Sequence, residues 1–189
     1  MALISARTII TSVSLFHLTL AFFFLTNPGT IADQAIVYVI GEAMGMPYAR
    51  SFENHSPPLA LLAIILATMG ISDLASLSLP EEVCLFQHWT TQAPIRLTVS
   101  LGLTIYAFLA SSSSPLYSAR QRSTLSHPSA HAFNPSYRPS TWGGEALKNR
   151  VIFAFVFFET FGWFWAWVTL REERSIYEAK KARRRNHMD

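Results

Sequence analysis

The stretch VIFAFVFFETFGWFWAW, residues 151–167, is almost wholly hydrophobic, yet Glu159 lies in its middle. Its apolar character extends over about 20 residues, the length that an α-helix needs to cross about 30 Å of hydrocarbon. Lys148 precedes the stretch and Arg171 follows it, as is usual for charged residues at the ends of a membrane span. The sequence therefore predicts a transmembrane helix over residues 148–170 that contains one acidic side chain.

Three further hydrophobic stretches predict spans over about residues 9–25, 58–79 and 95–111. The second begins at a pair of prolines and ends before Pro80, which are positions that proline favours at helix ends. The first could instead be a secretory signal, but it is long for such a core and no small-x-small cleavage pattern follows it. We interpret it as a retained anchor, and we expect an all-α, polytopic membrane protein with four spans.

Residues 31–46, between the first two predicted spans, predict an amphipathic helix. Two acids and a length of about 16 residues make this segment a poor span, so we expect it to lie at the membrane surface or against the protein. The alternative is a fifth crossing, which would separate the termini. The residues that would share its apolar face are Ala32, Ile36, Val39, Ile40 and Ala43.

Residues 112–147 are rich in Ser and Pro, and this composition predicts a flexible loop without a core of its own. His127 and His131 are four residues apart in this loop, but Pro128 lies between them and no Cys or acidic residue is near. We interpret them as loop histidines rather than metal ligands.

Residues 171–189 form a tail with a basic cluster, and this tail could continue the last span as a helix. Basic residues beside a span set its orientation by the positive-inside rule or bind anionic lipid headgroups. We therefore expect cytosolic termini and contact with membrane lipids, and not nucleic-acid binding, because no recognition fold is evident. The predicted headgroup contacts are Lys180, Lys181, Arg183, Arg184 and Arg185.

Four ionisable residues fall inside the predicted spans and form two hypothetical pairs. His17 lies midway along the first span and Glu159 midway along the fourth, so the two could meet at the same depth and share a proton. Asp73 lies in the inner half of the second span and Arg96 at the inner start of the third, within reach of a snorkelling side chain. Polar groups at such depth usually face the bundle interior, a partner protein or a wet cavity.

Two interpretations of these residues remain open. In the first, His17, Glu159, Asp73 and Arg96 hold the bundle together or dock a helix of a partner protein. In the second, Glu159, His17 and Asp73 form an ion- or proton-linked site of a small channel or transporter. The first is favoured because a transporter usually contains inverted repeats and broken helices, and no repeat is visible in this sequence.

Enzyme signatures are absent from the sequence, which contains no glycine-rich phosphate loop, serine elbow, HExxH motif or paired CxxC motif. The lone Cys84 excludes an internal disulfide and a cysteine metal cluster. We therefore expect a noncatalytic protein without a metal or another cofactor.

The segment MALISARTIITSVSLFHLTLAFFFLTNPGTIADQAIVYVIGEAMGMP, residues 1–47, resembles the N-terminal part of the fungal "increased loss of mitochondrial DNA" family. The resemblance implies a small polytopic protein of the endoplasmic reticulum membrane, whose loss affects the mitochondrial genome indirectly. It implies no known chemistry and no assigned binding residues. Together with the basic tail and the amphipathic segment, it suggests an accessory subunit or adaptor in a larger membrane protein complex that handles lipids or builds membranes.

Overall fold

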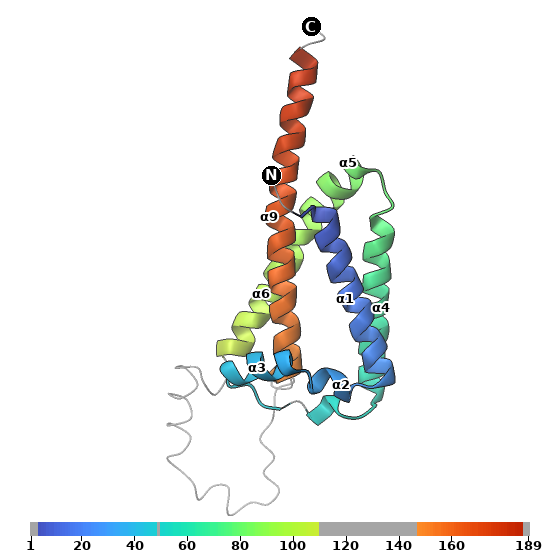
Figure 1. Ribbon diagram of the computed structural model, residues 1–189, viewed down its shortest axis with the longest axis vertical. Helices are drawn as coiled ribbons and strands as arrows, with labels where there is room; N and C mark the ends of the chain where they lie inside the picture. Colours follow the sequence, from blue (N-terminus) through green and yellow to red (C-terminus); the bar gives the residue numbers. More distant parts are fainter. Residues whose placement is uncertain (1–3, 49, 110–146, 187–189) are drawn as a thin grey trace, which may run out of the picture.

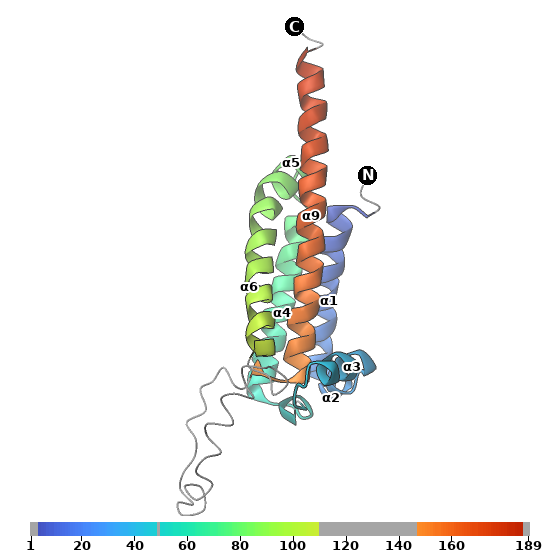
Figure 2. The ribbon, with the colours of Figure 1, turned by 90° about the vertical axis from the view of Figure 1, so that its left-hand side faces the viewer.

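The computed structural model describes residues 4–48, 50–109 and 147–186, and this part of the chain is helical without strands. Its long helices are α1 (Ala6–Thr26), α4 (Pro57–Ser76), α6 (Thr90–Leu109) and α9 (Arg150–Asn186). They run alternately up and down beside one another (Figures 1 and 2). In the described residues, α1, α4 and α9 are long and apolar enough to cross a membrane. The expected all-α membrane fold is therefore confirmed, whereas α6 is of similar length but is not among these three helices.

The ends of α1 and α4 follow from local sequence signals. The hydroxyl of Ser5 accepts a hydrogen bond from the backbone N–H of Thr8 and so caps the start of α1. This helix ends at Thr26, just before Asn27 and Pro28. Prolines occupy the first turn of α4, where their missing N–H groups need no partner within the helix.

Short helices cover the end of the bundle where α1 finishes, which we call the α3 end. They are α2 (Gly29–Ala32), α3 (Ala35–Ala43) and the 3₁₀ helix η1 (Arg50–Phe52). The 9 residues of α3 span about 14 Å, too short to cross a bilayer. Figure 1 shows α3 lying across this end of the bundle, as expected of a surface or protein-packed helix.

The predicted apolar face of α3 is only partly the face that packs. Ile36 and Val39, which were expected to share it, are 51% and 62% exposed, whereas Val37 and Gly41 are buried. A side chain at position 41 would overlap Arg150 of α9, because a Cβ there would lie 2.3 Å from the Arg150 Cγ. Glycine therefore permits α3 to approach α9, and this approach turns Ile36 and Val39 outward.

At the opposite end, α5 (Glu81–Val83) and the π-helix η2 (Cys84–Trp89) connect α4 to α6. The third predicted span began at residue 95, just after Pro94, but α6 begins at Thr90 and contains Pro94. Residues 110–146 lie outside the described residues. They include the end of the third predicted span, the predicted loop up to residue 146, and the loop histidines His127 and His131.

Helix α9 contains 37 residues and is about 55 Å long, so it continues well beyond the bundle. Figures 1 and 2 show this extension leaving the end where α1 begins, which we call the tail end. The basic tail is thus helical as far as Asn186. The two ends of the described chain lie at the tail end of the molecule, which is compatible with the four expected spans.

Close helix contacts depend on small residues. A Cβ at Gly70 of α4 would lie 2.8 Å from the backbone oxygen of Ser14 in α1, and one at Gly162 of α9 would lie 3.0 Å from Val13. Such small residues let membrane helices approach closely and gain van der Waals contact. Helix α4 packs mainly on α1, α1 also packs on α9, and α9 packs on α6. In order of contact, the helices are therefore α4, α1, α9 and α6. A groove is lined by residues of α4 and α6, the first and last helices of this order.

Candidate functional site

A buried hydrogen bond joins the middle of α1 to the middle of the apolar part of α9. His17 is fully buried and Glu159 is 8% exposed, and the imidazole Nε2 lies 2.8 Å from the carboxylate Oε1. The second carboxylate oxygen of Glu159 accepts a hydrogen bond of 2.6 Å from the indole N–H of Trp163, one turn further along α9. The carboxylate that the sequence places in a hydrophobic helix therefore has a partner for each of its oxygens, and one partner is the residue expected from their equal depth.

The second hypothetical pair is also in contact. Arg96 of α6 donates two hydrogen bonds to Asp73 of α4, at 2.5 and 2.8 Å. This two-pronged arrangement is the strong geometry for a guanidinium and a carboxylate. The Asp73 side chain is 3% exposed and that of Arg96 is 23% exposed. The bridge therefore connects α4 to α6 across the groove and remains partly open on its α6 side.

Trp163 links the two pairs, a role that the sequence did not reveal. Its ring lies 4.8 Å from the Arg96 guanidinium carbon, and it stacks on Trp89 with ring centres 5.5 Å apart. Both rings are fully buried, so neither tryptophan serves as an anchor at the membrane interface. The four-residue spacing of Glu159 and Trp163 is the sequence signal that could have revealed their contact.

The resulting polar layer touches all four long helices. In order of contact, it runs from α1 through α9 and α6 to α4 and consists of His17, Glu159, Trp163, Arg96 and Asp73. Two carboxylates face one guanidinium and one imidazole, so the layer is electrically neutral when the His17–Glu159 pair holds one additional proton. The buried Nδ1 of His17 has no hydrogen-bond partner among the described residues. The layer can therefore fix the rotation of each helix, and its His17–Glu159 end can also hold a proton.

The groove between α4 and α6 is lined mainly by α4, and Arg96 is its lining residue from α6. Its volume is about 330 Å³, and the Asp73–Arg96 bridge forms part of its lining. Ser72 makes no hydrogen bond in the described part of the chain, and the hydroxyl of Thr68 bonds only to Ile64 of its own helix. The full lining consists of Ile64, Ile65, Thr68, Met69, Ser72, Asp73 and Arg96.

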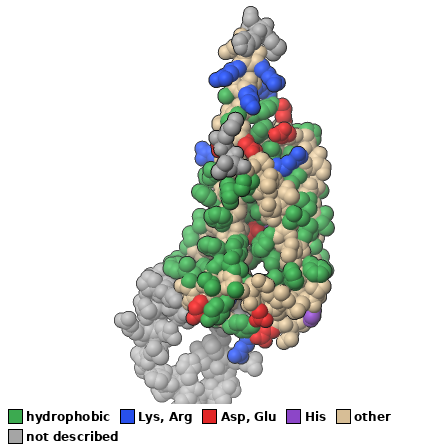
Figure 3. Space-filling model, in the orientation of Figure 1, with side chains coloured by type: hydrophobic (Ala, Val, Ile, Leu, Met, Phe, Trp, Pro, Cys, Tyr) green, Lys and Arg blue, Asp and Glu red, His purple; other side chains and the backbone are tan. Residues whose placement is uncertain are grey.

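Charged side chains gather at both ends of the hydrophobic body (Figure 3). The predicted headgroup contacts Lys180, Lys181, Arg183, Arg184 and Arg185 all lie on the projecting part of α9 and are exposed. This location is compatible with a basic surface beyond the membrane, although contact with lipid stays a prediction. The structure does not bring these residues to the polar layer, which lies within the bundle.

The tail of α9 is attached to α5 and η2. The Tyr177 hydroxyl donates a hydrogen bond to Glu82, and its ring packs 4.8 Å from that of Phe86. The hydrogen bond to Glu82, followed by burial, raises the pKa of Tyr177 above its ordinary value. The carboxylate of Glu173 accepts a hydrogen bond from the backbone N–H of Ala6. These contacts fix the first turns of the tail against the start of α1.

At the α3 end, Arg150 holds α3 against the start of α9. Its guanidinium donates hydrogen bonds to the backbone oxygen of Met46 and to the carboxylate of Glu42, and it lies over the ring of Tyr38. Among the described residues, no group of three or more histidine, cysteine or acidic side chains is arranged to hold a metal ion.

Comparison with known proteins gives one clear result. No curated protein and no solved structure matches this chain. The family described as "increased loss of mitochondrial DNA protein 1" matches residues 4–180, which include all four long helices up to the basic tail. The chain therefore belongs to this family, whose name links it to the maintenance of mitochondrial DNA.

Proposed function

We propose that the protein is a noncatalytic accessory subunit or adaptor of the endoplasmic reticulum membrane. It docks a transmembrane helix of a larger protein complex that handles lipids or builds membranes, and it binds no nucleic acid. Its link to mitochondrial DNA is then indirect, through the membranes that this machinery supplies. The observation that carries the proposal is the groove between α4 and α6, with the partly exposed Asp73–Arg96 bridge in its lining.

A transmembrane helix is the occupant that this groove fits best. Thr68 and Ser72 present small hydroxyl side chains one turn apart, a spacing that permits close helix approach and hydrogen bonds between helices. A partly exposed ion pair is costly in hydrocarbon, so a partner that covers Arg96 stabilises the assembly. The polar layer supports this role by holding α4 and α6 at the separation that leaves the groove open.

The test is purification of the tagged protein at native abundance in a gentle detergent, followed by mass spectrometry of the copurifying chains. Thr68→Leu should reduce recovery of a stoichiometric partner, because the larger side chain fills the groove. Thr19→Leu is the matched control, since Thr19 is also exposed and its hydroxyl also bonds to the backbone of its own helix. Recovery of the protein alone, or only as a homo-oligomer, would contradict the proposal.

The second candidate is a small ion- or proton-linked channel that uses Glu159, His17 and Asp73. The mid-bundle hydrogen bond between His17 and Glu159 favours it, because this pair can hold a proton. Reconstitution into liposomes separates the two functions. Ion flux that Glu159→Gln abolishes supports the channel, whereas no flux with normal insertion supports the accessory subunit.

A further inference from the structure

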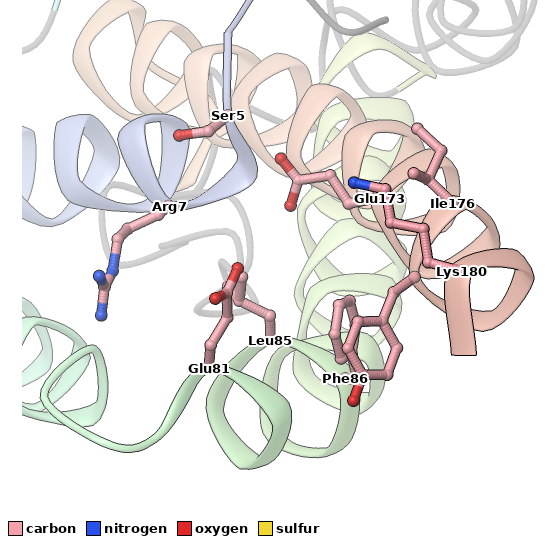
Figure 4. Close-up of a pocket in the computed structure, with 9 residues that line it drawn as sticks. Ser5, Arg7, Glu81, Leu85, Phe86, Glu173, Ile176 and Lys180 are labelled. Carbon is pink, nitrogen blue, oxygen red and sulfur yellow. The ribbon is translucent and has the colours of Figure 1, made fainter. Parts of the chain in front are cut away.

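A second pocket opens at the tail end of the bundle, away from the polar layer. Its volume is about 400 Å³, within the range of small-ligand sites. Figure 4 shows its walls, which come from the start of α1, from α5 and η2, and from the tail of α9. The lining residues are Ser5, Arg7, Glu81, Leu85, Phe86, Glu173, Ile176, Tyr177 and Lys180.

The pocket contains two free charges of opposite sign on different walls. In the described part of the chain, the side chains of Glu81 and Lys180 make no hydrogen bond or ion pair, with each other or with another residue. The other two charged groups are engaged, because Glu173 accepts from the N–H of Ala6 and Arg7 donates to the backbone oxygen of Leu77. Two acids and two bases make the pocket electrically balanced, so a zwitterion suits it better than an anion or a cation.

The height of the pocket matches the headgroup layer of a membrane. Its lower wall includes the buried Leu85, next to the apolar part of the bundle, and Glu173 lies just beyond the last hydrophobic turn of α9. From Glu173 to Lys180 the helix rises about 10 Å. The headgroup region of one leaflet is about 5–8 Å thick. A lipid headgroup in the adjacent leaflet would therefore lie beside the lower part of this stretch, and the long side chain of Lys180 would have to reach down to it.

The chemistry of the walls distinguishes between zwitterionic headgroups. A primary ammonium donates N–H hydrogen bonds, which a free carboxylate accepts. A trimethylammonium group has no N–H and is held instead by open aromatic faces. The ring of Tyr177 packs on Phe86, and the ammonium of Lys181 lies 5.7 Å from the centre of the Tyr177 ring. These aromatic faces are therefore already occupied and do not suit a trimethylammonium group.

We propose that this pocket binds the headgroup of phosphatidylethanolamine. Glu81 accepts hydrogen bonds from the ammonium, Lys180 binds the phosphate, and the acyl chains descend beside Leu85 and Phe86 into the membrane. The inference rests on the proposed function in one respect, because it requires the tail end to face a lipid leaflet. It extends that function by naming the lipid class and the residues that select it.

Native mass spectrometry of the full-length protein tests this proposal. The delipidated protein in detergent is offered phosphatidylethanolamine, its monomethyl and dimethyl derivatives, and phosphatidylcholine at equal concentrations. Retention should fall as N–H groups are lost and should be weakest for phosphatidylcholine. Glu81→Gln should lower retention of phosphatidylethanolamine about tenfold, since it removes a charged hydrogen-bond acceptor.

Two matched variants control for charge alone. Glu178→Gln removes a carboxylate of the same tail that pairs with Arg174 outside the pocket, and Arg174→Gln is the basic control for Lys180→Gln, which should weaken retention. Both controls should retain phosphatidylethanolamine. Equal retention of phosphatidylethanolamine and phosphatidylcholine, or no effect of Glu81→Gln, would each overturn the proposal.

The outcome is separable from that of the proposed function. Phosphatidylethanolamine retained by a protein that copurifies with no partner would count against the accessory-subunit role alone. A partner that copurifies with a protein lacking this lipid preference would count against the headgroup site alone.

Discussion

Replacement of Glu159 by leucine tests whether the buried carboxylate holds the bundle together. The change removes the acceptor of two hydrogen bonds, one from Trp163 and one shared with His17, in a region where neither donor can reach bulk water. Leucine is close to glutamate in size, so the effect on packing volume is small. The expected loss therefore comes from the two unsatisfied polar groups.

The magnitude follows from two reference values. An unsatisfied buried donor costs about 1–3 kcal/mol, and interhelical hydrogen bonds measured in a membrane protein average about 0.6 kcal/mol. Two such losses amount to about 1–6 kcal/mol. For a chain of this size, the apparent melting temperature should fall by roughly 2–24 °C. The melting temperature of the Glu159→Gln variant should fall less, because the glutamine amide can still accept a hydrogen bond from Trp163 and donate one to His17.

The assay uses Cys84, the single cysteine of the chain, which is fully buried in the structure. A fluorogenic maleimide reacts with this thiol when the protein unfolds, so a thermal ramp in detergent reports unfolding without an introduced cysteine. Phe164→Leu provides a control on the same helix, because Phe164 is 52% exposed and should face lipid.

A double variant sharpens the interpretation. If His17 and Glu159 interact, the losses from His17→Phe and Glu159→Leu will not add in the combined protein, because the partner of each is already gone. Strictly additive losses, or a Glu159→Leu protein as stable as the original, would refute the reasoning.

Three other predictions concern the packing, the tail and the topology. Gly70→Leu should lower the unfolding temperature in the same thiol assay, because its Cβ would meet the backbone oxygen of Ser14 at 2.8 Å, and overpacking costs about 1–3 kcal/mol; an unchanged temperature would contradict this close crossing. Because the hydrogen bond to Glu82 raises the pKa of Tyr177, the neutral phenol is favoured in the folded state, so this stabilisation is present below pH 10 and is lost as pH rises through the raised value. In an absorbance titration, the Tyr177→Phe variant should accordingly lack one tyrosine that ionises late in the original protein. Absence of a tyrosine with an ordinary pKa instead would argue against the contact. Epitope tags at the two termini should become accessible together in selectively permeabilised cells, whereas opposite accessibility would exclude an even number of crossings.

Much of the architecture is encoded locally. The length of each apolar run predicts a span, because hydrocarbon thickness sets a minimum helix length regardless of what the helix packs against. Proline and capping residues place the ends of α1 and α4 within a few residues. Equal depth also made His17 and Glu159, and Asp73 and Arg96, reasonable pairs, since position along a span is read directly from the sequence.

The tertiary structure decided which face of each helix points inward, and this depends on contacts between segments far apart in the chain. It brought Trp89 and Trp163 into one buried stack, turned Ile36 and Val39 of α3 outward, and left a groove between α4 and α6. Strong hydrophobicity on all sides of a helix conceals these choices, because lipid and protein interior are equally apolar. The sequence thus predicts which helices are long and apolar enough to cross the membrane and which polar residues share a depth. The rotation of each helix, set by close packing and the polar layer, decides which side chains those polar residues contact.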